Sequence, residues 1–353
     1  MGGQNVVPLM PKSHDFKLTA IVPAYNEADS VAETVDSLLT QTLLPVEVIV
    51  IDDCSTDETA AVATAAGATV LTPPANTGSK AGAQTFALDS VETEFVMAVD
   101  ADTTLAPDAI EKLAAAFDDE QVAAACGFVL PRYVSTVWER GRYVEYLLAF
   151  SFFKRIQDHY GKPLISSGCF SIYRTAELRA AGSWSTRTMA EDMDLTWTLY
   201  AADHKVRFVP GAVSFPIEPH NSDFMGKQLR RWSHGFLQNV RLHWRSLLDL
   251  GYLRSTVAVG VWDAVLASLA YLVVLPVLAL LVNPLFLLAY LVDAPVLLVP
   301  VLWQAVSRGE TLKALASFPS FFVLRIVNGF YMLGAVWREV IVRRPLLVYE
   351  KGH

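Results

Sequence analysis

Charged residues and cysteines are both scarce in this chain of 353 residues. Only 18% of the residues are charged and 53% are hydrophobic, so the composition excludes an intrinsically disordered protein. The cysteines, Cys54, Cys126 and Cys169, are too few and too far apart for a disulfide framework or a structural zinc site, and they favour a reducing, cytosolic setting. The net charge of −8 argues against a general nucleic-acid-binding protein.

Basic residues are absent from a long stretch near the C-terminus. Residues 255–307 contain no Lys or Arg, and their only acidic residues are Asp263 and Asp293. Apolar runs at 257–282 and 285–303 are long enough to cross a bilayer core, which needs roughly 20 residues. A third run carries Arg325 and Asn328 in its middle, and it predicts either a span packed against other helices or a helix in the membrane interface. We therefore expect two to three spans over residues 255–337.

The segments that flank the apolar runs are basic. Residues 221–254 predict amphipathic interfacial helices on the cytoplasmic face, and the tail at 338–353 is basic as well. Two spans would leave the tail on the cytoplasmic face and three would move it to the other side, so the sequence leaves the side of the C-terminus open. Residues 1–15 lack the apolar segment of a signal peptide and are predicted to be a flexible N-terminus.

Residues 16–220 alternate between short apolar runs and helical patterns. The runs at 18–22, 46–51, 68–71 and 95–99 predict buried strands. Helical patterns begin near Asp29, Asp57, Lys80 and Pro107, with the two aspartates as plausible N-caps. This alternation predicts an α/β domain with a mainly parallel sheet, in which ligands bind at the carboxyl ends of the strands.

Acidic residues follow three of the predicted strands. Glu27 lies just after the first strand, Asp52-Asp53 ends the second, and Asp100-Ala-Asp102 follows the fourth. Each group alone could be a cap or a solvated turn, but three acidic strand ends on one edge would repel each other without a divalent cation. The segment NTGSKAG lacks the P-loop spacing, so we expect the metal and a cation such as Lys80 to hold a phosphate.

Three later segments also predict a site. The glycine of Ser167-Gly168-Cys169-Phe170 permits close approach of a ligand to the backbone, or it marks a simple turn. Glu191 and Asp192 open a helix, where they are either capping residues or a general base. In Gln228-Leu-Arg-Arg-Trp232 the helical spacing puts Gln228 on one face with Arg231 or Trp232, although a basic helix on anionic lipid would also contain such residues.

The ordered segments PAYNE, IDDCSTDET, VDADT, SGCF, AEDMDL and QLRRW, over about residues 18–250, resemble the motif series of the processive, membrane-bound family 2 glycosyltransferases. That family includes cellulose, chitin, hyaluronan and poly-N-acetylglucosamine synthases. The resemblance implies a GT-A fold followed by an α-helical membrane region. It also implies inverting transfer from a UDP-sugar with Mg²⁺ or Mn²⁺.

The motif positions carry the expected roles. Asp192, beside Glu191, is the expected general base, and Asp102, with Asp100, the expected metal ligand. The residues expected at the donor are Pro23, Tyr25, Glu27, Asp52, Asp53, Lys80, Asp100, Gln228, Arg231 and Trp232. The residues expected at the acceptor are Gly168, Cys169, Phe170 and Trp232.

Two departures from the family bear on function. Ala190 replaces the usual Thr before Glu191, and two or three helices cannot enclose a sugar channel alone. The chain would therefore extend a β-linked saccharide as a homo-oligomer, or it would not secrete a long polymer. The close alternative is a single transfer to a lipid acceptor, as in ceramide glucosyltransferases. An alternative of another class is a non-catalytic membrane scaffold with a relic nucleotide fold.

Overall fold

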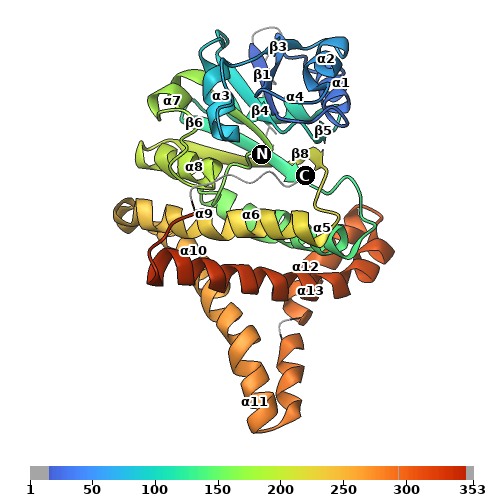
Figure 1. The fold of residues 1–353 in the computed structure, drawn as a ribbon, viewed down its shortest axis with the longest axis vertical. Coiled ribbons are helices and arrows are strands. Elements are labelled where there is room, and N and C mark those ends of the chain that lie inside the picture. Colours follow the sequence, from blue (N-terminus) through green and yellow to red (C-terminus); the bar gives the residue numbers. More distant parts are fainter. Residues whose placement is uncertain (1–15, 293, 347–353) are drawn as a thin grey trace, which may run out of the picture.

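The computed structural model describes residues 16–292 and 294–346 (Figure 1). Its eight strands form one sheet in the order β3-β2-β1-β4-β7-β6-β8-β5. The strands are β1 (Leu18–Ala24), β2 (Glu47–Asp52), β3 (Thr69–Leu71), β4 (Phe95–Val99), β5 (Thr103–Leu105), β6 (Val122–Val129), β7 (Phe170–Arg174) and β8 (Lys205–Pro216).

The four strands predicted from the sequence are present, with small shifts at their ends, and they form the parallel part of the sheet. β1 pairs in parallel with both β2 and β4, and β2 pairs in parallel with β3. Beyond β4 the sheet is mixed, because β7 is antiparallel to β4 and β6, while β8 runs parallel to β6 and antiparallel to β5. The predicted α/β class with a mostly parallel sheet is confirmed, whereas β5 to β8 were not predicted.

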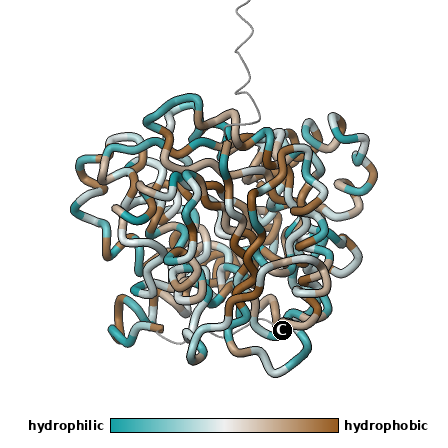
Figure 2. Tube along the Cα trace, turned by 90° about the horizontal axis from the view of Figure 1, so that it is seen from above, coloured by the Kyte–Doolittle hydropathy of each residue, from teal (hydrophilic) through white to brown (hydrophobic). Residues whose placement is uncertain are grey.

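Helices cover both faces of this sheet. They are α1 (Val31–Leu39), α2 (Thr59–Ala65), α3 (Lys80–Leu88), α4 (Ala109–Ala114), α5 (Val137–Leu148), α6 (Lys154–His159), α7 (Thr175–Ala180) and α8 (Glu191–Ala201). In β4, Phe95, Met97 and Val99 join one core with α1 and α4, while Val96 and Ala98 join a second core with α3 and α8. The alternation follows from the two-residue period of a strand. Seen from above, the apolar chain gathers in the middle of the domain (Figure 2).

The second half of the chain is helical. It contains α9 (Ser222–Asp249), α10 (Gly251–Val261), α11 (Leu275–Leu281), α12 (Ala294–Ser307) and α13 (Thr311–Val336). The π-helical segments η3 (Trp262–Ala267) and η4 (Ala270–Val274) join α10 to α11, and a 3₁₀ helix, η5 (Pro284–Leu291), makes the return. In Figure 1, α9 and α13 lie side by side below the sheet, and the hairpin of α11 and η5 extends away from them.

Two helical stretches are long and apolar enough to cross a membrane: Gly251–Leu281 and Thr311–Ile341. The predicted second span at 285–303 is not one helix of that length. Asn283-Pro284 starts a 3₁₀ segment, and α12 begins only at Ala294. Asp293, the N-terminal residues 1–15 and the end of the basic tail, residues 347–353, lie outside the described residues.

The two predicted aspartate N-caps are wrong by one position each. Ser30 is the N-cap of α1 and Glu58 that of α2. Asp57 nevertheless accepts the backbone N–H of Thr59 through its carboxylate, at 3.1 Å. Asp57 lies one residue before the N-cap, and its side chain still accepts a hydrogen bond from an N–H group that the first turn of α2 leaves without a partner in the helix.

Candidate active site

The carboxyl ends of β1, β2 and β4 meet at one edge of the sheet. Ala24 lies beside Asp52 in the parallel register, and the N–H of Asp53 donates to the carbonyl of Ala24 at 2.8 Å. The Asp53 carboxylate accepts both the N–H and the hydroxyl of Thr77, at 2.7 and 2.9 Å. Asp53 therefore fixes the loop before α3, and it turns the N-terminus of that helix towards the strand ends.

Four of the predicted residues form one continuous chain of contacts. The Lys80 ammonium forms an ion pair with Asp100 and donates to the carbonyl of Gly168 at 3.0 Å. The N–H of Gly168 in turn donates to Oδ2 of Asp192 at 2.9 Å. Lys80 and Asp192, which are more than 100 positions apart in the sequence, are thus connected through the backbone of Gly168.

Gly168 lies in this chain because no larger residue fits there. A Cβ at position 168 would lie 2.8 Å from Oδ2 of Asp192. The sequence predicted that a ligand approaches the backbone at this glycine; in the structure the Asp192 carboxylate lies there, and the approach of a ligand stays a prediction.

The two acids at the start of α8 are harder to ionise than free carboxylates. Burial raises the pKa of Asp192, against the opposing effects of Lys80, the backbone N–H groups of Gly168 and Met193, and Arg231. Burial, followed by the neighbouring Asp192, raises the pKa of Glu191. A carboxyl group with a raised pKa that remains hydrogen-bonded has the properties of a general base.

A cleft opens beside this chain of contacts. It has a volume of about 230 Å³ and is lined by Thr77, Lys80, Thr188 and Glu191, among others. Its position at the N-terminus of α3, with Lys80 in its lining, suits a negatively charged ligand.

The two acids of the Asp100-Ala-Asp102 segment could hold a divalent metal together with a ligand. Both are partly exposed, and no third carboxylate, His or Cys joins them within residues 16–292 and 294–346. Mg²⁺ and Mn²⁺ prefer oxygen ligands, and Mg²⁺ sites of one or two carboxylates are completed by phosphate oxygens and water. The donor set therefore fits a metal that arrives with a diphosphate.

Helix α9 places the Gln228 and Trp232 side chains on Arg142, a residue that sequence reasoning missed. Arg142 is 0% exposed, donates to Oε1 of Gln228 at 2.5 Å, and lies 4.5 Å from the centre of the Trp232 ring. It also pairs with Glu145 and, at 3.4 Å, with Glu218. The shared face of Gln228 and Trp232 is therefore explained by a buried guanidinium between α5 and α9, while the charge of Arg231 acts on the acids of α8.

A second contact locks α9 against the segment that precedes α8. Asn239 donates to the carbonyl of Ala190 at 3.0 Å, and a Cβ at Gly235 would lie 2.6 Å from that of Ala190. Ala190, the small residue that departs from the family pattern, is thus matched by Gly235 on the opposing helix. Within α8, the Asp194 carboxylate accepts hydrogen bonds from His243 and from Arg187, at 2.6 and 2.7 Å.

The structure does not bring every predicted residue to the site. Phe170 is fully buried, because it begins β7 and its ring packs where a Cβ of Gly127 would lie. Its side chain therefore belongs to the core and not to an acceptor site. Cys169 is partly buried, and this burial raises the pKa of its thiol well above the usual value, while its expected place at the acceptor stays a prediction.

Pro23, Tyr25 and Glu27 stay at the edge where the donor is expected. Pro23 pairs with Ile51 in the sheet, and Tyr25 is exposed. Glu27 accepts the hydroxyl of Ser30 at 2.8 Å, beside the start of α1.

The sequence profile described as glycosyl transferase family 2 matches residues 19–180. Residues 19–180 form a glycosyltransferase family 2 domain. The matched range includes Asp53, Asp102 and Gly168, while the acids of α8 and all of α9 follow the family 2 domain in the chain.

Two curated relatives extend the likeness beyond the family 2 domain. A poly-beta-1,6-N-acetyl-D-glucosamine synthase of Staphylococcus epidermidis is 27% identical over 223 residues, which cover 62% of this chain and 54% of the relative. The glycosyltransferase YaiP of Escherichia coli (strain K12) is 33% identical over 249 residues, which cover 66% of this chain and 60% of the relative. The chain spans little more than half the length of these proteins.

A solved structure resembles nearly the whole chain. The mannosyltransferase PcManGT from Pyrobaculum calidifontis, solved with GDP-Man and Mn²⁺, has a TM-score of 0.62 and 19% identity, and the match covers 93% of this chain and 88% of that one. The chain has the GT-A glycosyltransferase fold, as the motif series implied.

Proposed function

We propose that this protein is a membrane-bound, inverting glycosyltransferase that moves a sugar from a UDP-sugar to a saccharide acceptor and extends a β-linked glycan. One observation carries the proposal: the contacts that link Asp100, Lys80, Gly168 and Asp192 bring two expected donor residues, Asp100 and Lys80, together with the expected base. The relatedness to poly-N-acetylglucosamine synthases supports a saccharide acceptor. The intact acids count against the scaffold alternative.

The proposed reaction is a single displacement at C1 of the donor sugar. Asp192 takes the proton of the acceptor hydroxyl as its oxygen forms the new C1–O bond, and the nucleoside diphosphate leaves with the electron pair of the broken bond. Lys80 and Arg231 stabilise the charge that develops on the leaving diphosphate. A divalent metal at Asp102 would neutralise the same charge as a Lewis acid. One in-line attack inverts the configuration and needs no second carboxylate.

The apolar helices support a membrane placement of this enzyme. Helix α13 packs on α5 and α9 with one face, and the opposite face carries an exposed apolar stripe. The members of this stripe recur at helical spacing: Leu312, Leu315, Val323, Ile326 and Phe330. A helix with this pattern lies in the plane of the interface.

The remaining apolar segment begins with α10, which packs on α9, and residues 262–292 then form the hairpin that points away from the domain (Figure 1). Its residues are mostly exposed, as expected for a segment that contacts lipid. We propose that the hairpin enters the bilayer while α13 lies on its cytoplasmic surface, with the catalytic domain above. Both flanks of the hairpin then stay on one side, and the flank that precedes it, α9 and the start of α10, is basic, as expected for the cytoplasmic side.

Transfer to a lipid acceptor is the second candidate, because the described chain offers only two helices of spanning length. Two helices cannot surround a growing polysaccharide, whereas a lipid acceptor would reach the active site from the membrane interface.

A donor screen tests the proposal. Purified protein with Mg²⁺ or Mn²⁺ is incubated with UDP-glucose, UDP-N-acetylglucosamine and GDP-mannose, and nucleotide release and product mass are measured. A ladder of saccharides with a UDP-sugar supports the extension of a glycan, and one organic-soluble product supports the lipid acceptor. Release only from GDP-mannose would refute the UDP assignment, and the absence of binding and transfer with all three would refute an enzyme of this class.

A further inference from the structure

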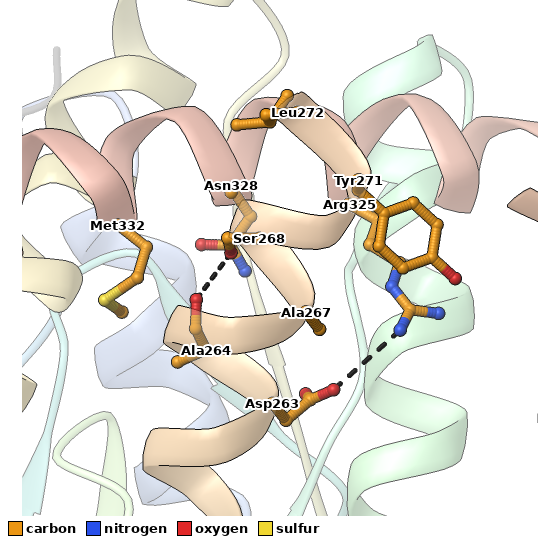
Figure 3. Close-up of a pocket in the computed structure, with 10 residues that line it drawn as sticks. Asp263, Ala264, Ala267, Ser268, Tyr271, Leu272, Arg325, Asn328 and Met332 are labelled. Atoms are coloured by element: carbon orange, nitrogen blue, oxygen red, sulfur yellow. Dashed lines mark hydrogen bonds and ion pairs between the residues drawn. The ribbon is translucent and has the colours of Figure 1, made fainter. Parts of the chain in front are cut away.

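A polar pocket lies where the hairpin meets α13 (Figure 3). It has a volume of about 120 Å³, and it is lined by η3 and η4 on one side and by α13 on the other. Its polar lining residues are Asp263, Ser268, Tyr271, Arg325 and Asn328. None of them belongs to the candidate active site.

The pocket exists because two helices cross closely at a glycine. A Cβ at Gly329 would lie 3.1 Å from the hydroxyl oxygen of Ser268, so a larger residue would push α13 away from the hairpin. Both hairpin segments at the crossing are π-helical, a distortion that often marks functional sites.

The pocket contains charges of opposite sign. Nη2 of Arg325 lies 3.8 Å from Oδ1 of Asp263. The guanidinium also lies 4.6 Å from the centre of the Tyr271 ring. The Asn328 amide, which lines the same pocket, forms no hydrogen bond within the described part of the chain.

The pocket lies at the depth of the lipid headgroups in the proposed membrane placement. Trp262, next to Asp263, is exposed, and such tryptophans gather at the membrane–water interface. The same stretch of the hairpin exposes Leu266, Leu269 and Val273, so apolar surface lies close to the pocket. A lipid with its headgroup in the pocket would have its acyl chains beside the hairpin.

From this combination we propose that the pocket binds the headgroup of a zwitterionic phospholipid with a primary ammonium, such as phosphatidylethanolamine. Arg325 and Asn328 bind the phosphate, because a guanidinium presents forked donors and an amide adds one more. Asp263 accepts from the ammonium. An anionic lipid is disfavoured, because its headgroup has no ammonium to pair with the Asp263 carboxylate. The proposal rests on the membrane placement given above.

Lipid retention measured by native mass spectrometry tests the site. The protein is purified in detergent with equal amounts of phosphatidylethanolamine, phosphatidylcholine and phosphatidylglycerol. The detergent is then removed in the mass spectrometer, and the lipids that stay bound to the protein are identified. We expect wild type to retain phosphatidylethanolamine, and Arg325→Gln to retain about tenfold less, because the variant loses the charge-assisted hydrogen bonds to the phosphate. Arg338→Gln, an exposed arginine at the end of the same helical stretch, is the matched control and should retain it as wild type does.

A second variant gives the proposal a signature that loss of folding cannot imitate. Asp263→Asn leaves the pocket with a net positive charge, so its preference should change from phosphatidylethanolamine to phosphatidylglycerol. Equal retention by wild type and Arg325→Gln, or displacement of phosphatidylethanolamine by phosphatidylglycerol or a polyprenyl phosphate in wild type, would overturn the proposal. Carbonate extraction tests the membrane placement separately, because a protein released by carbonate would refute the placement itself.

Discussion

Replacing Gly168 by Ala tests the contact on which the proposed mechanism depends. The added Cβ would lie 2.8 Å from Oδ2 of Asp192, and an oxygen held by a hydrogen bond cannot give way without weakening that bond. A hydrogen bond to a charged group contributes about 1.5–3 kcal/mol. Loss of this bond would displace the Asp192 carboxylate from its position, and a misplacement of about 1 Å lowers turnover by about 100-fold.

The same substitution should move the pH profile. The N–H of Gly168 lowers the pKa of Asp192, so a weaker bond leaves that pKa higher. Because the base acts in its deprotonated form, the acidic limb of the turnover profile should shift to higher pH. The affinity for the nucleoside diphosphate should change little.

The assay follows nucleotide release at saturating donor from pH 5 to 9, with donor binding measured by calorimetry. Gly211→Ala is the matched control, because a Cβ there makes only ordinary contact with Lys112, at 3.5 Å. Wild-type turnover and an unshifted acidic limb in Gly168→Ala would refute the role of this contact.

Four further substitutions test other parts of the site. Asp192→Asn should abolish transfer and leave donor binding nearly intact, and wild-type turnover in this variant would remove Asp192 as the base. Asp102→Asn should lose metal-dependent binding of UDP in calorimetry with and without Mn²⁺; metal-dependent affinity equal to that of wild type would contradict the metal assignment. Arg142→Lys keeps the charge but loses the planar guanidinium that holds Gln228 and Trp232. Transfer should therefore fall about tenfold, while the melting temperature falls by only a few degrees. An unchanged rate of transfer would show that the guanidinium does not position α9. Asp194→Asn should lower the melting temperature by about 5 °C or more at pH 7, since truncating a buried ion pair costs about 3 kcal/mol.

The pH dependence of the last effect has a definite sign. Burial raises the pKa of Asp194, but the hydrogen bonds from His243 and Arg187 outweigh burial and leave it below the ordinary value of 3.8. The stabilisation is therefore fully present above that value and is lost as the pH falls through the lower pKa of the folded state. The gap in melting temperature between wild type and Asp194→Asn should narrow below about pH 4, and a gap that stays constant to pH 3 would contradict the pairing.

Local patterns were sufficient for the first half of the domain. β1 to β4 are continuous apolar runs because both faces of these strands are covered by helices, and such runs stand out in a sequence. The later strands were missed because their composition is weak in strand-forming residues: β6 is rich in alanine, and β8 contains Pro210 and Gly211. The helix starts were misplaced by a residue because capping depends on backbone angles that composition does not reveal.

The amino-acid sequence alone determined the class of fold, the order of the motif residues and the presence of apolar segments, because each of these depends on residues close together in the chain. Only the tertiary structure decided that Arg142 is buried beneath Gln228 and Trp232, and that Phe170 faces the core. It also decided that α13 runs along α9 while the hairpin points away. These facts arise from packing between segments far apart in the sequence, where the surroundings of a side chain, and not its identity, set its charge state and its role.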